Sequence, residues 1–154
     1  MITLIDSIGS NSGLVINPRI WRKYFKNVCT GFFKYVHEEG LYTSICIDGN
    51  SKEILDDLNE MDVDLYFLPD INTTGIKVIK DKLKDKICIK ATIDMKTTLA
   101  MGTPEEVRKE AKDLVENLNS PNGGFICEVI RWHRPEFPND NVLASVEAFN
   151  KYRK

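Results

Sequence analysis

Several polar side chains that could take part in chemistry follow short apolar runs of the sequence. These side chains are Asp6 and Ser7 after the first run, Cys46 and Asp48 at the second, Asp70 after the third, Asp94 and Lys96 after the fourth, and Glu128, Arg131 and His133 at the fifth. Carboxylates that face cationic side chains can bind a charged ligand and can stabilise charge that develops during a reaction. We therefore take these residues as the candidate site.

Some of these residues also have a purely structural explanation. Asp48, Gly49 and Asn50 form the pattern of an ordinary turn between a strand and a helix. Asp94 can serve only to cap a turn. The loop over residues 7–13 is small and polar enough to hold a phosphate, but it lacks the glycine order of the known phosphate loops. His37 lies at the edge of a helical seam, where a structural role is expected.

The apolar runs have the length and composition of β-strands. They cover residues 2–5, 42–47, 63–68, 87–93 and 125–130 and are rich in Ile, Val, Tyr and Phe. Helical patterns separate them, and this strict alternation predicts a parallel sheet with right-handed crossovers. In such a sheet the working site lies at the carboxyl ends of the strands, which is where the candidates fall.

Capping residues mark the helix boundaries. Asn17 before Pro18 is typical of a helix start, and Thr103 with Glu106 forms a capping box. Ser51 is expected to cap another helix. Apolar residues at helical spacing predict a buried seam on the first helix, which consists of Trp21, Phe25, Val28, Phe32 and Val36.

Two architectures fit the alternation of strands and helices. One is a five-stranded, doubly wound sheet with helices on both faces. The other is part of an eight-stranded barrel, although a complete barrel takes about 250 residues. A receiver domain is disfavoured, because Asp6 has no acidic neighbour and Arg131 stands where that fold has a lysine.

Composition limits the class of protein. The chain has 154 residues, 42% of them hydrophobic, with 21 basic and 23 acidic side chains and a net charge of -2. This length supports one core, so we expect a single domain over residues 1–154. The lack of a basic excess argues against a nucleic-acid partner, and no apolar run approaches the roughly 20 residues of a membrane span. We expect a cytoplasmic protein with four unpaired cysteines.

An ordered series of motifs resembles the carboxyl-terminal part of the uroporphyrinogen decarboxylase superfamily. The motifs are Asp6-Ser7 before a glycine-containing loop, Asn17-Pro18 with Trp21, residues 35–40 followed by Asp48-Gly49-Asn50, Val63-Asp64, residues 91–94, residues 102–107, and residues 123–126 with Pro138 and Asn141. That group includes the decarboxylase of haem synthesis and the zinc-dependent, corrinoid-linked methyltransferases. The resemblance implies an α/β fold that is an incomplete (β/α)8 TIM-type barrel of about five parallel strands.

The same resemblance implies that neither chemistry of the superfamily is intact. The methyltransferases bind zinc through an H-x-C pair and a late cysteine, and these positions resemble Cys46, Asp48 and Arg131 here. We therefore expect no zinc or other cofactor, and if zinc is bound its ligands are Cys46 and Asp48. The arginine and aspartate that grip the substrate in the decarboxylase belong to the amino-terminal half, which this sequence lacks.

The function implied is a domain that binds a tetrapyrrole or related anionic substrate, with metal-free decarboxylation if the missing half completes it. Arg131 and His133 would pair with substrate carboxylates, while Asp6 and Asp48 would orient ring N–H groups. Ser7, Asp94 and Glu128 would be further substrate contacts. The alternatives are a corrinoid-linked methyltransferase with an altered zinc site, and a non-catalytic binding or interaction subunit of the same fold.

An open barrel segment also has consequences for assembly. Its first and last strands would each expose unpaired backbone groups, and both runs are apolar and free of proline. We expect the chain either to form a homo-oligomer or to dock with a polypeptide that supplies the missing barrel strands.

Overall fold

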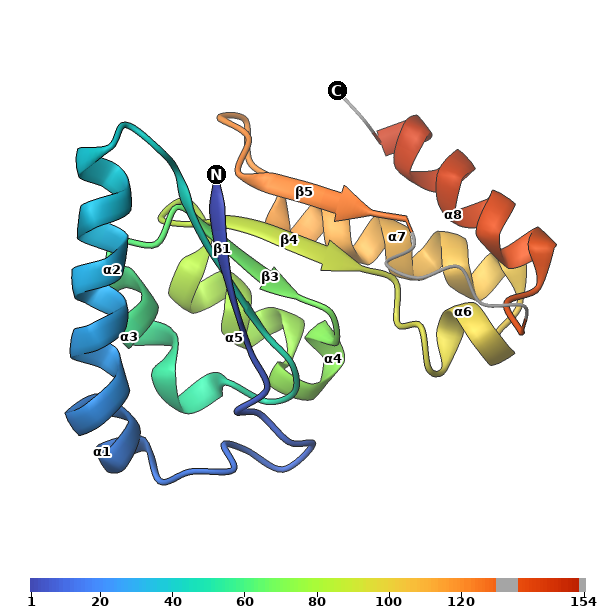
Figure 1. Cartoon of the computed structure of the whole chain (residues 1–154). Helices are drawn as coiled ribbons and strands as arrows, with labels where there is room; N and C mark the ends of the chain where they lie inside the picture. The colour runs from blue at the N-terminus through green and yellow to red at the C-terminus, as the bar shows by residue number, and fades with distance from the viewer. Residues whose placement is uncertain (130–135, 153–154) are drawn as a thin grey trace.

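The computed structural model describes residues 1–129 and 136–152. Within these ranges five strands alternate with helices (Figure 1). The strands are β1 (Ile2–Asp6), β2 (Thr43–Ile47), β3 (Leu65–Leu68), β4 (Cys88–Thr92) and β5 (Phe125–Glu128). The helices and helical turns are α1 (Pro18–Trp21), η1 (Arg22–Lys26), α2 (Asn27–Glu38), η2 (Lys52–Ile54), α3 (Leu55–Glu60), α4 (Ile71–Thr74), α5 (Ile76–Leu83), α6 (Thr98–Met101), α7 (Pro104–Leu118) and α8 (Asn139–Tyr152).

The strands form one parallel sheet in the order β1-β2-β3-β4-β5. A doubly wound sheet reverses its strand order at a switch point. Here each strand lies next to its neighbour in sequence, so every crossover advances in the same direction, as it does in a barrel. The predicted five parallel strands of an incomplete (β/α)8 barrel are confirmed, and the doubly wound alternative is wrong.

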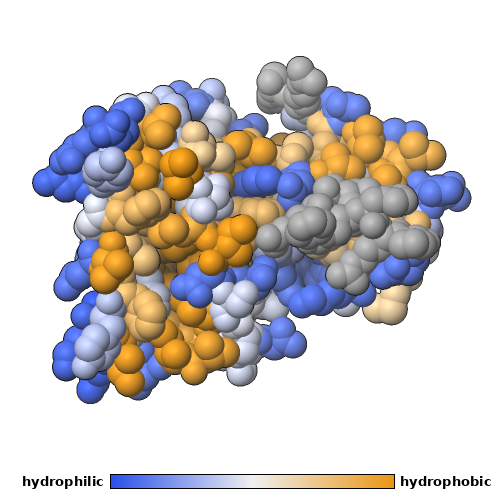
Figure 2. Space-filling view, viewed as in Figure 1, coloured by the Kyte–Doolittle hydropathy of each residue, from blue (hydrophilic) through white to orange (hydrophobic). Residues whose placement is uncertain are grey.

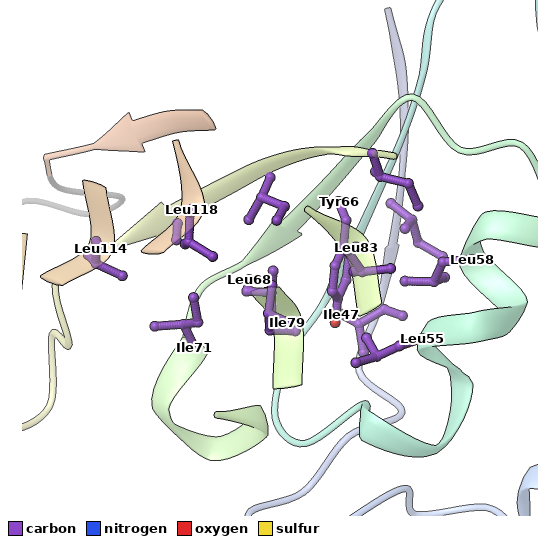
Figure 3. Packing of buried hydrophobic residues seen from close by; sticks show 14 of the residues in the cluster. Ile47, Leu55, Leu58, Tyr66, Leu68, Ile71, Ile79, Leu83, Leu114 and Leu118 are labelled. Carbon is purple, nitrogen blue, oxygen red and sulfur yellow. The ribbon is translucent and has the colours of Figure 1, made fainter. Parts of the chain in front are cut away.

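The main hydrophobic core lies between one face of the sheet and the helices that cover it (Figure 3). Successive strand residues point to opposite faces, so Tyr66 and Leu68 of β3 reach this core while Phe67 does not. Helices α3, α5 and α7 supply the opposing layer through Leu55, Leu58, Ile79, Leu83, Leu114 and Leu118. Phe67 belongs to a second cluster on the other face of the sheet, which we call the inner face.

Two of the three predicted caps are confirmed. The Asn17 side chain accepts a hydrogen bond from the amide of Arg19 at 2.9 Å, and both hydrogen bonds of the Thr103–Glu106 capping box are present. The expectation for Ser51 is wrong, because its side chain makes no capping hydrogen bond. The Ser51 hydroxyl is buried and pairs instead with the buried hydroxyl of Tyr66, which needs a polar partner inside the core.

The predicted seam of the first helix is confirmed at Trp21 and Val36 and wrong at the three positions between them, Phe25, Val28 and Phe32. A π-helical turn, η1, separates α1 from α2, and a π turn contains one residue more than an α turn. The residues that follow it are therefore shifted by one position around the helix. As a result α2 buries Phe33 together with Val36, whereas Phe25 is 46% exposed and Val28 is 70% exposed.

The π turn brings two cations to one carboxylate. The Asp57 side chain of α3 is almost fully buried and lies 2.8 Å from both Arg22 Nη2 and Lys26 Nζ. Burial acts to raise the pKa of Asp57, but the hydrogen bonds and charges of Arg22 and Lys26 outweigh it and hold this pKa below its ordinary value. The cost of the irregular turn is thus offset by an ion-paired link between the first helix and α3.

At the amino-terminal side of the sheet, His37 has the structural role expected of it. Its Nε2 lies 2.8 Å from Asp64 Oδ2, and the same carboxylate accepts hydrogen bonds from the amide and hydroxyl of Thr43. These contacts tie the end of α2 to the starts of β2 and β3. In the described ranges, no helix combines the length and apolar character needed to cross a membrane.

Candidate functional site

The carboxyl ends of the strands bring together three predicted polar loops. Lys96, which follows β4, donates a hydrogen bond to Asp70 after β3 at 2.8 Å. This hydrogen bond raises the pKa of Lys96, and the nearby carboxylates of Asp70, Asp94 and Asp48 act in the same direction. Aspartates from the ends of β2, β3 and β4 therefore act electrostatically on one ammonium group, which is in hydrogen-bond contact with Asp70.

Asp94 uses its oxygens to build the loop after β4. Its Oδ1 accepts hydrogen bonds from the amides of Lys96 and Thr97 at 2.8 Å, and its Oδ2 accepts one from Asn72 Nδ2 at 3.2 Å. Burial acts to raise the pKa of Asp94, but these donors outweigh it and keep the pKa below its ordinary value. These contacts are the ones expected if Asp94 caps the turn after β4.

Asp48 is held at the end of β2 by the loop that follows β1. The amide of Asn50 donates to the carbonyl of Ser10 at 2.8 Å, and the amide of Asp48 lies 3.4 Å from the carbonyl oxygen of Asp6. Ser7 begins this loop and is exposed. These hydrogen bonds hold the carboxyl end of β2 beside the carboxyl end of β1.

Asp6 is placed differently from Asp48. It pairs in register with Ile47, whose side chain belongs to the main core, and alternation puts the Asp6 side chain on the same, helix-facing side. Burial raises the pKa of the Cys29 thiol of α2, and the charge of Asp6 raises it further, which fits this placement. Burial also raises the pKa of Asp6 itself. The backbone of Asp6 is therefore in contact with that of Asp48, while the Asp6 side chain lies on the helix-facing side of the sheet.

The inner face of the sheet carries a cation that the sequence reasoning missed. Lys90 Nζ of β4 lies 2.6 Å from Glu128 Oε1 of β5 and 4.5 Å from the centre of the Phe67 ring. An ammonium over an aromatic ring is attracted by the ring's quadrupole. The second oxygen of Glu128 is buried, and no described residue donates a hydrogen bond to it.

A signal for Lys90 was present in the sequence. It lies between Ile89 and Ala91 in an apolar run, and both neighbours point into the main core. Period-two alternation therefore directs Lys90 to the inner face. A lysine in the middle of a predicted barrel strand is unusual enough to mark a candidate, because a buried cation needs a partner.

Cys46 lies in an apolar part of the inner face rather than in a group of metal ligands. It packs with Leu65 and Phe67, and Cys88 lies against them. Burial raises the pKa of the Cys88 thiol, which opposes the thiolate form that zinc requires. Across residues 1–129 and 136–152, no three histidine, cysteine or acidic side chains are grouped as metal ligands would be. The described residues therefore do not fit a closed zinc site.

Two predicted residues cannot be placed. Arg131 and His133 fall outside the described residues, so their expected pairing with substrate carboxylates stays a prediction. Of the other candidates, Asp48 and Asp94 lie at the strand ends near Lys96, Cys46 and Glu128 lie on β2 and β5, and Asp6 faces the helix layer.

Comparisons with known proteins place the chain in a family. The family model for uroporphyrinogen decarboxylase (URO-D) matches residues 1–152. Among solved structures, a methyltransferase from Methanosarcina mazei is similar, with a TM-score of 0.73 and 19% sequence identity. That match covers 99% of this chain but 42% of the methyltransferase, so this chain spans less than half the length of that protein. A search of curated proteins gave no match. Because the family model extends over nearly all of its residues, the chain belongs to the uroporphyrinogen decarboxylase (URO-D) family.

Proposed function

We propose that the chain contributes one wall of a binding site for a tetrapyrrole or a related polycarboxylate, in a barrel completed by further polypeptide. The observation that carries the proposal is the group formed by Phe67, Lys90 and Glu128 on the inner face, in which Glu128 is the last residue of β5. An apolar ring surface beside fixed charges suits a flat aromatic ligand with acidic substituents.

Each group has a distinct part in this proposal. Phe67 offers apolar contact to a pyrrole ring, and Lys90 exchanges Glu128 for a substrate carboxylate. Asp48 accepts ring N–H groups, a part assigned to it alone because Asp6 faces α2. A carboxylate–ammonium hydrogen bond of this kind contributes about 1.5–3 kcal/mol.

The proposed reaction is decarboxylation without a metal. As the bond between a side-chain methylene carbon and its carboxylate breaks and carbon dioxide leaves, the pyrrole ring delocalises the electron pair, and the methylene carbon then takes up a proton. The surrounding charged groups stabilise the ring through electrostatics. Arg131 and His133 remain the proposed partners of substrate carboxylates, and the groups supplied by the missing half complete the site. The isolated chain is expected to bind the ligand without turning it over.

Titration of the purified chain with uroporphyrin, the stable oxidised form of an octacarboxylate substrate, tests binding through the quenching of porphyrin fluorescence. Lys90→Met should weaken binding about tenfold or more, because it removes a charge-assisted hydrogen bond. Lys90→Arg should retain much of the affinity, and Lys112→Met, an exposed change on α7, is the matched control. Equal affinity for Lys90→Met and wild type, with both folded, would refute the proposed site.

A second candidate is a methyltransferase with an altered zinc site. The similarity to the Methanosarcina mazei methyltransferase favours it, as does the placement of Cys46 and Asp48 two residues apart on β2 and its end. The absence of a three-ligand group among the described residues counts against it. Zinc content therefore separates the two candidates, and porphyrin binding without turnover in the completed barrel would favour a non-catalytic binding subunit.

A further inference from the structure

A cleft between the carboxyl-terminal ends of α2 and α3 lies at the opposite end of the sheet from the candidate site. Its volume of about 450 Å³ falls within the range of roughly 300–1,000 Å³ that is usual for small-molecule sites. Figure 2 shows hydrophilic residues gathered around the carboxyl-terminal end of α2, at the upper left of the view. Both walls belong to the described residues, so the cleft does not depend on further polypeptide. The lining residues that bear on its chemistry are Lys34, His37, Glu38, Glu60, Met61 and Asp62.

Asp64 fixes which ring nitrogen of His37 carries a proton. Its Oδ2 accepts hydrogen bonds from the amide and hydroxyl of Thr43 at 2.7 Å and 2.9 Å, and it lies 2.8 Å from His37 Nε2. Burial acts to raise the pKa of Asp64, but the donors of Thr43 and His37 outweigh it and hold this pKa below its ordinary value. An ionised carboxylate can only accept, so Nε2 donates, and in the neutral ring Nδ1 is then an acceptor.

The Nδ1 atom of His37 faces Asp62, and both residues line the cleft. It is 3.8 Å from Asp62 Oδ2, which is too long for a direct hydrogen bond. A nitrogen placed between these two atoms can lie about 2.9 Å from each and donate to both. The two acceptors therefore form a site for one group that carries N–H donors.

The cleft also has an excess of negative charge. Glu60 is ion-paired with Lys26 of η1, and Glu38 lies 3.9 Å from Lys34. For Asp62, no lysine or arginine among residues 1–129 and 136–152 forms an ion pair with it. The carboxyl-terminal ends of α2 and α3, which carry partial negative charge, add to this excess. A cation is the ligand that this arrangement favours.

We propose that the cleft binds a small organic cation that carries a primary ammonium group on a short apolar chain. The ammonium group donates one hydrogen bond to His37 Nδ1 and one to Asp62 Oδ2, and its third N–H points to solvent. The apolar chain packs over Met61, a buried residue that lines the cleft. The bond from His37 Nε2 to Asp64 holds the ring in the orientation that this contact needs.

Other kinds of ligand fit the cleft less well. Zinc sites in proteins use three or four side-chain ligands, and no group of three is present in the part of the chain that the structure describes. An anion would lie against Asp62 and the helix ends, which carry like charge. The cleft is also separate from the proposed tetrapyrrole site, so the proposal does not rest on that function.

Nitrogen-15 NMR of the histidine rings, with butylamine as the probe, tests the proposal at about pH 8, where histidine is ordinarily neutral. The chain has two histidines, and His37→Gln identifies the signals of His37. Without butylamine, Nε2 should give the signal of a protonated nitrogen and Nδ1 that of an unprotonated one. Butylamine should shift the Nδ1 signal saturably, with a dissociation constant on the order of 1 mM. Tetramethylammonium has the same charge but no N–H donor and should leave this signal in place.

Two matched variants test the carboxylate. Asp62 has a φ of +57° and Asp85, in the turn before β4, has one of +65°. Asparagine adopts this left-handed conformation more readily than most residues, so Asp62→Asn and Asp85→Asn both preserve the backbone. Asp62→Asn should weaken butylamine binding about fivefold, because it removes a solvent-exposed charge. Asp85→Asn should leave the affinity unchanged.

Several results would overturn the proposal. One is a His37 ring that carries its proton on Nδ1 in the absence of butylamine. Another is an Nδ1 signal that butylamine does not shift, or that tetramethylammonium shifts equally. Equal affinity of Asp62→Asn and wild type, with both folded, would also contradict it. Zinc binding at the same nitrogen, tighter than that of butylamine, would assign the cleft to a metal ion instead.

Discussion

The backbones of Gly9 and Gly49 are in close contact where the loop after β1 crosses the turn after β2. A Cβ on Gly9 would overlap the carbonyl oxygen of Asp48, and a Cβ on Gly49 would lie 2.6 Å from the carbonyl carbon of Gly9. Gly49 also has a φ of +80°, which side chains disfavour. Because the obstructing atoms are backbone, no rotamer change relieves the overlap. This contact fixes Asp48 at its place in the candidate site.

Alanine at Gly9 should therefore destabilise the protein. We expect Gly9→Ala to lower the free energy of unfolding by about 2–3 kcal/mol, since the loop must move away from the turn. Urea denaturation measures the change. Gly31→Ala is the control, because Gly31 lies inside α2 with nothing within 4 Å of a new Cβ, and it should stabilise the protein by about 0.5–1 kcal/mol. Equal stability of Gly9→Ala and wild type would contradict the close crossing.

The ion-paired Asp57 should make stability fall in acid. Its pKa is lower in the folded chain than in the unfolded chain, so the unfolded state binds the proton more readily. The stabilisation is present above the unfolded pKa of about 3.9 and is lost as pH falls through the folded value. Asp57→Asn should flatten the pH dependence of urea unfolding in this acid window and cost about 2–3 kcal/mol near neutrality.

An exposed aspartate provides the comparison for this acid effect. Asp56 is adjacent in sequence, but 65% of its side chain is exposed, and its partner Lys82 is 45% exposed. Asp56→Asn should change stability by less than about 0.5 kcal/mol and leave the acid profile as it is in wild type. An acid transition of unchanged steepness in Asp57→Asn would show that other carboxylates dominate it.

The alternation of strands and helices could be predicted because it depends on local patterns. A few neighbouring residues are enough to identify each of the five apolar runs, the Asn17 cap and the Thr103–Glu106 capping box. The choice between a barrel segment and a doubly wound sheet could not be made from periodicity, since both have the same alternation. The strand order decided it.

Features that depend on tertiary contacts could not be read in the same way. The π turn at Arg22–Lys26 lies where two cations reach Asp57, which is more than thirty residues away in the sequence. The local spacing of apolar residues does not predict this turn. The side of the sheet that Asp6 faces follows from its register with Ile47. Lys90 is the exception, because alternation alone directs it to the inner face.

Asn141 should hold α8 in place through two hydrogen bonds. Its side chain is buried, and Nδ2 donates to the carbonyls of Leu99 at 3.0 Å and Gly102 at 2.8 Å. Asn141→Ala leaves both carbonyls at the end of α6 without this donor and should cost about 2–3 kcal/mol. Asn150→Ala, an exposed change on the same helix, should fall within about 0.5 kcal/mol of wild type. Chemical denaturation of both variants checks the difference.

Zinc analysis provides the last prediction, because it separates the two proposed chemistries. Cys46 packs among Leu65 and Phe67, and burial raises the pKa of the neighbouring Cys88 thiol. Zinc needs deprotonated thiols and several converging ligands, and the described residues do not group three of them. Protein purified without added metal should therefore contain well under one zinc per chain by elemental analysis. A zinc content near one per chain that is lost in Cys46→Ala but kept in Cys127→Ala would contradict this expectation and favour the methyltransferase.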